Sequence, residues 1–231
     1  MLKKFKNIVL VGTSHISKES ISLVETTIQT EKPNIIAIEL DRSRFQSIIS
    51  KKRQKISLVE VRKIGMKGFL FRVIGAWISQ KLGKETGIVP GSEMKTAIKL
   101  AKELNISIAL IDQDISITLR NISKRITWKE RFMFIRDVLA TVFTSKKQLK
   151  IDLNKVPSKE KISLLSKKLK KDYPTIYQAL ISDRDQHMSK ALNKLSQENK
   201  DGKIVAVVGA GHIEGITRTL KKWSKKTVGR N

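Results

Sequence analysis

Two stretches near opposite ends of the chain, IVLVGTSHIS at 8–17 and VAVVGAGHIE at 205–214, share one pattern. In each, an apolar run ends at a glycine and a histidine follows three residues later, which uses two of the three histidines of the chain. Continuously apolar runs of this length are typical of strands buried on both faces of a parallel sheet. Glycine permits a tight exit from such a strand. We therefore expect His15 and His212 at the rim of one pocket.

Two further apolar runs, NIIAIEL at 34–40 and ISIALID at 106–112, have the same character. Helical patterns separate all four runs, so the order of elements predicts an α/β fold with a mostly parallel central sheet flanked by helices. Residues 114–200 are a long helical stretch and predict a helical insertion or lid within a single domain, 1–231.

Several residues predict where helices begin. Ser17 and Asp41 stand where N-caps are expected, and Ser92 is the expected cap of a helix over 90–105. The tetrapeptides SLVE at 57–60 and TWKE at 127–130 read as capping boxes, which predict helices near 58–64 and 128–143. A long helix is expected over 173–197.

Polar residues follow the predicted strands. Glu39 ends the second run, and Asp112 and Asp114 end the third. Ligands of open α/β sheets bind outside the carboxyl ends of the strands, so these carboxylates and the two histidines predict one pocket. We expect at least one of the two aspartates to do no more than cap the next helix.

The long predicted helix carries an apolar stripe, and Arg184 and Asp185 fall on its two margins. Charges at such positions tend to be paired or to reach into a site. His187 lies off the stripe, and we expect it to be exposed to solvent.

These residues belong to six ordered motifs that together resemble the TraB family, also called TraB/PrgY. The motifs are GTSHIS at 12–17, ELDRSR at 39–44, PGSEM at 90–94, DQDISITL at 112–119, DRDQHMS at 183–189 and VGAGHIEGI at 208–216. Gln113 stands where the family pattern has arginine. The family is related to the TIKI proteases and, more distantly, to erythromycin esterases and ChaN-like proteins.

The resemblance implies a metal-dependent hydrolase that acts on a peptide or small-molecule substrate, as the PrgY branch acts against peptide pheromones. It implies that His15, His212 and Glu39 surround a divalent metal, for which Mn²⁺, Co²⁺ and Zn²⁺ all remain open. Further roles follow for Glu93 (ligand or general base), for Arg184 oriented by Asp185 (grip on a substrate carboxylate or oxyanion), and for Arg44 and Asp114 (substrate binding).

Two alternatives stay open beside the metal-dependent hydrolase. In the first, a histidine acts as general base without a metal and carboxylates orient it. In the second, the chain binds a peptide, haem or another small ligand and does not turn it over.

Composition sets further limits. There is no cysteine, which excludes disulfides and thiolate ligands. The net charge of +26 permits non-specific association with anionic membranes or nucleic acid, whereas 5% aromatic residues are few for base stacking.

No signal peptide or membrane span is predicted. We expect a cytoplasmic protein, or one at the membrane periphery, that corresponds to the soluble domain of the family. The oligomeric state is left open.

Overall fold

A computed structural model describes residues 1–14, 17–50, 91–143 and 158–228, together with positions 62, 65, 69, 73 and 89. Its sheet has five strands in the order β1-β2-β5-β3-β4, with β1 antiparallel to β2 and all other pairs parallel. The strands are β1 (Leu2–Phe5), β2 (Ile8–Thr13), β3 (Ile35–Ile38), β4 (Ser107–Leu110) and β5 (Ile204–Gly209). The predicted α/β fold with a mostly parallel sheet is confirmed.

The edge strand β1 was not predicted. It has four residues, LKKF, and two of them are lysines, so it lacks the continuous apolar run that marks the buried strands. Exposed and half-buried residues alternate along it. An edge strand with outward lysines resists pairing with another chain, which explains a polar strand at this position.

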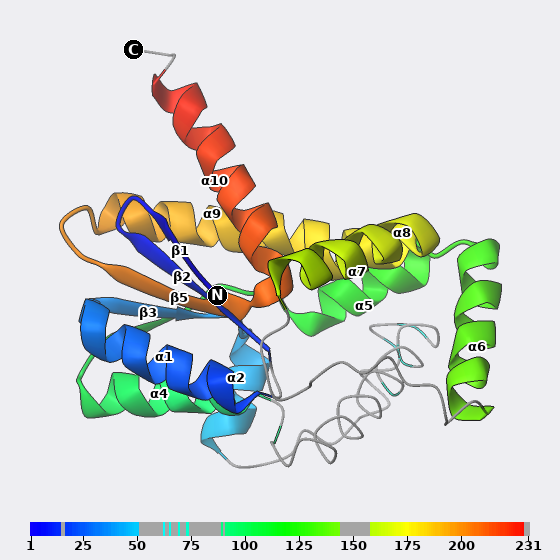
Figure 1. The fold of residues 1–231 in the computed structure, drawn as a ribbon, viewed down its shortest axis with the longest axis horizontal. Coiled ribbons are helices and arrows are strands. Elements are labelled where there is room, and N and C mark those ends of the chain that lie inside the picture. The colour runs from blue at the N-terminus through cyan, green and yellow to red at the C-terminus, as the bar shows by residue number, and fades with distance from the viewer. Residues whose placement is uncertain are drawn as a thin grey trace.

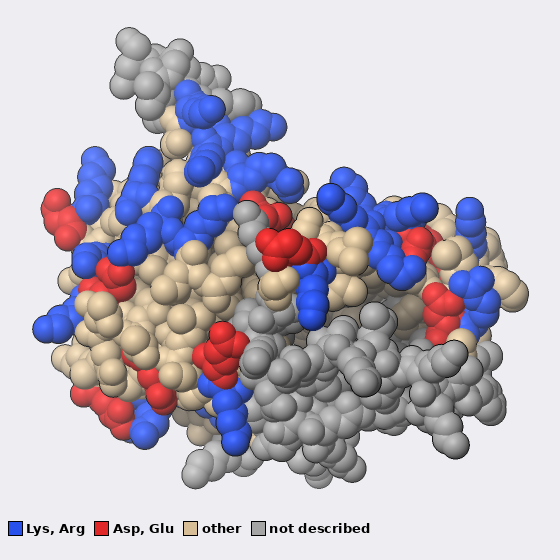
Figure 2. All heavy atoms as spheres, viewed as in Figure 1, with Lys and Arg blue, Asp and Glu red and all other residues tan. Residues whose placement is uncertain are grey.

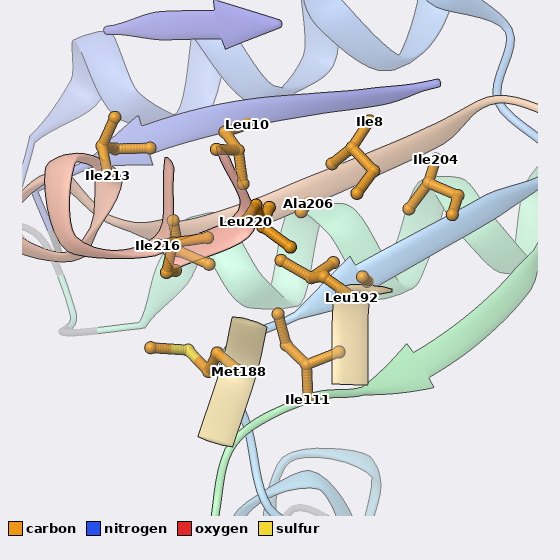
Figure 3. Packing of buried hydrophobic residues seen from close by; sticks show 12 residues of the cluster. Ile8, Leu10, Ile111, Met188, Leu192, Ile204, Ala206, Ile213, Ile216 and Leu220 are labelled. Carbon is orange, nitrogen blue, oxygen red and sulfur yellow. The ribbon is translucent and has the colours of Figure 1, made fainter. Parts of the chain in front are cut away.

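Two pairs of helices cover the two faces of the sheet (Figure 1). On one face lie α1 (Lys18–Glu31) and α4 (Ser92–Glu103), and on the other lie α9 (Asp183–Glu198) and α10 (Ile213–Val228). Because side chains alternate along a strand, β5 feeds both cores. Figure 3 shows Met188 and Leu192 of α9 near Ile216 and Leu220 of α10, in one cluster with Ala206 of β5.

Most of the predicted helical stretch forms a second group of helices: α5 (Ile115–Arg125), α6 (Trp128–Phe143), α7 (Lys159–Asp172) and α8 (Pro174–Tyr177). A separate small core holds them together, made of Ile122, Ile126, Ile176 and Ala179. Helix α9 instead packs in the core of the sheet through Met188 and Leu192. None of the helices in the described ranges is long and apolar enough to cross a membrane.

Most predicted helix starts are confirmed within these ranges. Ser17 accepts a hydrogen bond from the Ser20 amide, and Asp41 caps α2 (Arg42–Ile49). Thr127 and Glu130 form a reciprocal capping box at α6, because each side chain accepts from the backbone N–H of the other. The helix predicted near 58–64 lies outside the described residues.

Two predictions of helix geometry were wrong in detail. The N-cap of α4 is Gly91 with φ 84°, and Ser92 is already helical and donates its hydroxyl to the Val89 carbonyl. The long helix predicted over 173–197 is interrupted by a π-helical turn, Gln178–Ser182. Such turns have no simple sequence signature and are frequent at functional sites. The turn Gln178–Ser182 ends two residues before Arg184.

Candidate active site

Chain direction places five functional side chains at one edge of the sheet. Glu39 and Asp112 follow the ends of β3 and β4, and His212 ends the short 3-10 turn Ala210–His212 after β5. Arg184 and Asp185 begin α9, which precedes β5 and runs back along the sheet, so its first turn lies at the carboxyl ends of the parallel strands. Glu39, Asp112, Asp185 and His212 are all buried.

Arg184 connects these elements through its whole guanidinium group. Its Nε donates to Asp112 Oδ1 at 3.1 Å, and its Nη2 donates to Asp112 Oδ2 at 2.7 Å and also to Glu39 Oε1. Burial alone would lower the pKa of Arg184, but the charges and hydrogen bonds of Glu39 and Asp112 outweigh burial and raise it. The side chain is 13% exposed. Because its pKa is raised, Arg184 stays a cation although it is largely buried.

The second oxygen of Glu39 has a different partner. Its Oε2 accepts a hydrogen bond from the Gly209 amide at 2.6 Å, at the end of β5. Glu39 therefore ties the ends of β3 and β5 together, and the cost of burying its charge is offset by a cation and a backbone donor.

His212 lies between an anion and a cation. Its Nδ1 is 2.6 Å from Asp185 Oδ1, its Nε2 is 3.2 Å from Arg184 Nη1, and its Nε2 is 3.5 Å from Glu39 Oε1. A carboxylate only accepts, so Asp185 favours a proton on Nδ1, and an arginine only donates, so Arg184, which is nearer to Nε2 than Glu39 is, favours a lone pair on Nε2. These two contacts favour the neutral tautomer with the proton on Nδ1. Nε2 is then the basic atom of the site.

Two expectations about this histidine and its neighbours change. His212 is 4% exposed, so it is buried and does not lie at a pocket rim. Asp185 contacts His212, whereas Arg184 is held by Asp112 and Glu39. Burial raises the pKa of Asp185, and the hydrogen bond with His212 opposes that rise.

Two glycines near the site, Gly215 in the last motif (208–216) and Gly12 in the first (12–17), have steric reasons. A Cβ at Gly215 would lie 1.8 Å from Asp185 Oδ2, so only glycine leaves room for the carboxylate that holds His212. A Cβ at Gly12 would lie 2.8 Å from Ile213 Cγ1, where β2 meets the start of α10. The motif therefore specifies close packing around the histidine as well as the histidine itself.

Asp112 lies in the predicted pocket, but the sequence predicts no role for it there. Its side chain is fully buried and bridges two arginines, because Oδ2 also accepts from Arg44 Nη2 at 2.5 Å. Arg44 in turn contacts Asp41 through Nε at 2.6 Å and is 32% exposed. The position of Asp112 at the end of an apolar run placed it in the predicted pocket, but the sequence carries no signal for its two arginine partners. The adjacent Gln113 is buried and donates from Nε2 to Thr118 Oγ1.

The remaining predicted residues lie in different settings. Glu93 is buried in the first turn of α4, at the same edge of the sheet because α4 precedes β4. Asp114 is exposed and caps α5 by accepting from the Ser116 amide at 2.7 Å. His187 is exposed, as expected. His15 lies outside the described residues.

The described donor atoms do not fit a metal ion as they are arranged. Arg184 takes Glu39 Oε1 and faces His212 Nε2, so a guanidinium fills the cation position between the two predicted ligands. Within the described ranges, no group of three histidine or carboxylate side chains could hold a metal. The metal site of His15, His212 and Glu39 stays a prediction, because its third ligand is not among the described residues.

The motifs that resemble the TraB family supply Glu39, Asp112, Arg184, Asp185 and His212 of this site. A comparison with protein families also identifies the TraB family. The model of the TraB/PrgY/gumN family matches residues 2–228, and the chain belongs to this family.

Among the curated relatives, an uncharacterized protein of Methanocaldococcus jannaschii is 43% identical over 222 residues, which cover 94% of this chain and 54% of that protein. A TraB domain-containing protein of Homo sapiens is 23% identical and covers 94% of this chain and 62% of its own length. The chain thus spans little more than half the length of these relatives. A solved erythromycin esterase mutant in its open conformation is 12% identical with a TM-score of 0.37, covering 88% of this chain and 60% of that one.

Proposed function

We propose that the chain is a hydrolase of acyl bonds, with His212 as the residue that moves the proton. The observation that carries the proposal is the buried chain of contacts Asp185–His212–Arg184–Glu39 at the carboxyl edge of the sheet. A histidine held by a carboxylate at Nδ1 presents Nε2 as a base of fixed orientation. In hydrolysis, Nε2 takes a proton from water while the water oxygen attacks the acyl carbon and the carbonyl oxygen becomes an oxyanion. When the carbonyl forms again, the bond to the leaving group breaks, and the proton on Nε2 passes to the leaving group.

Arg184 has two roles in this proposal. It holds Glu39 and Asp112 in place, and its Nη1 is a donor close to the base, at 3.2 Å from Nε2. An oxyanion formed beside His212 would meet this donor. Substrate and water must first separate Nη1 from Nε2, because the base accepts that hydrogen bond in the structure. Asp185 is a positioning residue that acts through His212.

A metal-dependent form of the same proposal follows from the family resemblance, with a peptide as substrate. One observation supports it: among the described residues of the site, the buried carboxylates of Glu39, Asp41, Asp112 and Asp185 outnumber the guanidinium groups of Arg44 and Arg184, and Asp185 contacts His212 instead of an arginine. When bound, a divalent metal would acidify a water and polarise a carbonyl. Glu39 and His212 would be held away from Arg184 in that state.

The test uses a chromogenic short-chain ester and a fluorogenic peptide mixture, with and without chelator, and metal analysis of the same samples. His212→Ala should lower kcat/KM by a factor of about 10³ or more, since general base catalysis and its orientation are both lost. The matched control His187→Ala changes an exposed histidine and should leave kcat/KM unchanged.

The outcomes distinguish three hypotheses: a metal-free hydrolase, a metal-dependent hydrolase and a binding protein. Activity that survives chelator and depends on His212 supports the metal-free base. Activity and bound metal that disappear together in His212→Ala support the metal-dependent form. Binding of peptide without turnover by the wild type contradicts both and leaves a binding protein. Glu39→Gln should also reduce activity, because a neutral amide cannot keep the same charge beside Arg184.

A further inference from the structure

A second charged feature lies away from the buried network, in an open groove between β1 and α10. Its volume is about 560 Å³. It is lined by Lys3, Glu214, Thr217, Arg218, Lys221, Lys222 and Lys225. Figure 2 shows lysine and arginine side chains gathered along the projecting α10.

The groove carries unbalanced positive charge. Five lining residues are basic and one is acidic, which gives 5 − 1 = +4. From 218 to 228 the sequence RTLKKWSKKTV has no aspartate or glutamate. Like charges three and four residues apart destabilise a helix. The repulsion along this face of α10 would be relieved by an anion.

Three other helices each pair a lysine with an acidic residue four positions later. Lys99 pairs with Glu103 at 3.6 Å in α4, Lys168 with Asp172 at 2.9 Å in α7, and Lys194 with Glu198 at 3.7 Å in α9. From 218 to 228, α10 has no acidic residue that could form such a pair. Protection of a sheet edge accounts for Lys3 on β1, but it does not account for four basic residues on the facing helix.

We propose that this groove binds a small ligand with three or more contiguous phosphate groups. Lysine ammonium groups act as mobile point charges that suit phosphate oxygens, and a net charge of +4 complements a triphosphate. The volume falls within the range of small-molecule sites. The lining holds no apolar or aromatic residue, which disfavours insertion into a bilayer and stacking of bases.

The experiment is calorimetric titration of the full chain with inorganic tripolyphosphate at low and at physiological salt. Lys221→Glu/Lys225→Glu should weaken binding by about tenfold or more, because two attractive charges become repulsive. The matched control is Lys95→Glu/Lys99→Glu, the same change at the same spacing on α4, across the sheet from α10. It should stay within about twofold of the wild type.

Lys3→Gln tests the groove as a whole, because this residue belongs to β1. It should also weaken binding, and circular dichroism should show that all variants keep their helices. Equal losses in the α10 and α4 variants would overturn the proposal. So would binding of duplex DNA or phosphatidylserine vesicles that tripolyphosphate does not displace. Hydrolytic activity enters none of these measurements, so this proposal and the proposed function fail independently.

Discussion

The carboxyl edge of the sheet and the helical group α5–α8 both contain ion pairs, but they use them differently. At the sheet edge, Arg184 joins Glu39 and Asp112, residues 145 and 72 positions away, and all three are largely buried. In the helical group, Arg125 of α5 pairs with Asp183, the first residue of α9, at 3.0 Å with 53% of the arginine side chain exposed.

The sheet edge is also packed against more buried residues than the helical group is. The sheet edge rests on two large cores, whereas the described core of the helical group has four buried hydrophobic residues, and Trp128 and Phe132 of this group are 82% and 72% exposed. Charges at the sheet edge are therefore fixed by topology and cannot be solvated if a partner is lost. The Arg125–Asp183 pair is partly exposed, so water can replace a lost partner there.

Removal of Arg184 should have the largest effect on stability. Arg184→Met leaves Glu39 buried without its cation and leaves Asp112 with Arg44 alone, and should lower the free energy of unfolding by about 3–5 kcal/mol. Arg125→Met removes an exposed pair and should cost no more than about 1 kcal/mol. Urea denaturation of both variants measures the difference. Equal losses would remove the distinction between the two regions.

Gly215→Ala should have the next largest effect. The new methyl group would collide with Asp185 Oδ2 and push the carboxylate away from His212. We expect a loss of about 2 kcal/mol, since overpacking outweighs the better helix propensity of alanine, and a loss of activity comparable with that of Asp185→Asn. The matched control is Gly211→Ala, because a Cβ at Gly211 has no neighbour within 4 Å. A stable, active Gly215→Ala protein would contradict the role given to Asp185.

The sequence alone could predict those features of the fold and the site that depend on local sequence patterns. Apolar runs gave the parallel strands, and Ser17, Asp41 and the pair Thr127 and Glu130 gave helix starts. Chain order and the strand ends placed Glu39 and His212 at one edge. These features depend on near neighbours in the chain or on rules of sheet topology.

Contacts between distant residues could not be predicted in the same way. Which carboxylate holds His212 and which hold Arg184 depends on the rotation of the first turn of α9, and the π-helical turn at Gln178–Ser182 shifts that rotation. The bridging role of Asp112 depends on Arg44 and Arg184 approaching from two sides. The steric need for Gly215 appears only when α9 and α10 lie together.

The smallest expected effect concerns Tyr173 in the helical group, whose hydroxyl donates to Asp137 Oδ2 at 2.5 Å. Burial and this hydrogen bond raise the pKa of Tyr173 from 10.0 to about 12. Because the folded state holds the phenol proton more tightly than the unfolded state, the resulting stabilisation is complete below pH 10 and is lost as the pH rises through about 12.

Absorbance at 295 nm measures this titration. In a Tyr177→Phe background, Tyr173 is the single tyrosine, since the chain has two. Asp137→Asn should lower the pKa of Tyr173 but leave it above 10.0, because burial is the larger cause and remains. Arg136→Gln is the control, since Arg136 contacts Asp137 and lowers the pKa of Tyr173 only weakly. An unchanged pKa in Asp137→Asn would mean that water already replaces this contact in the helical group.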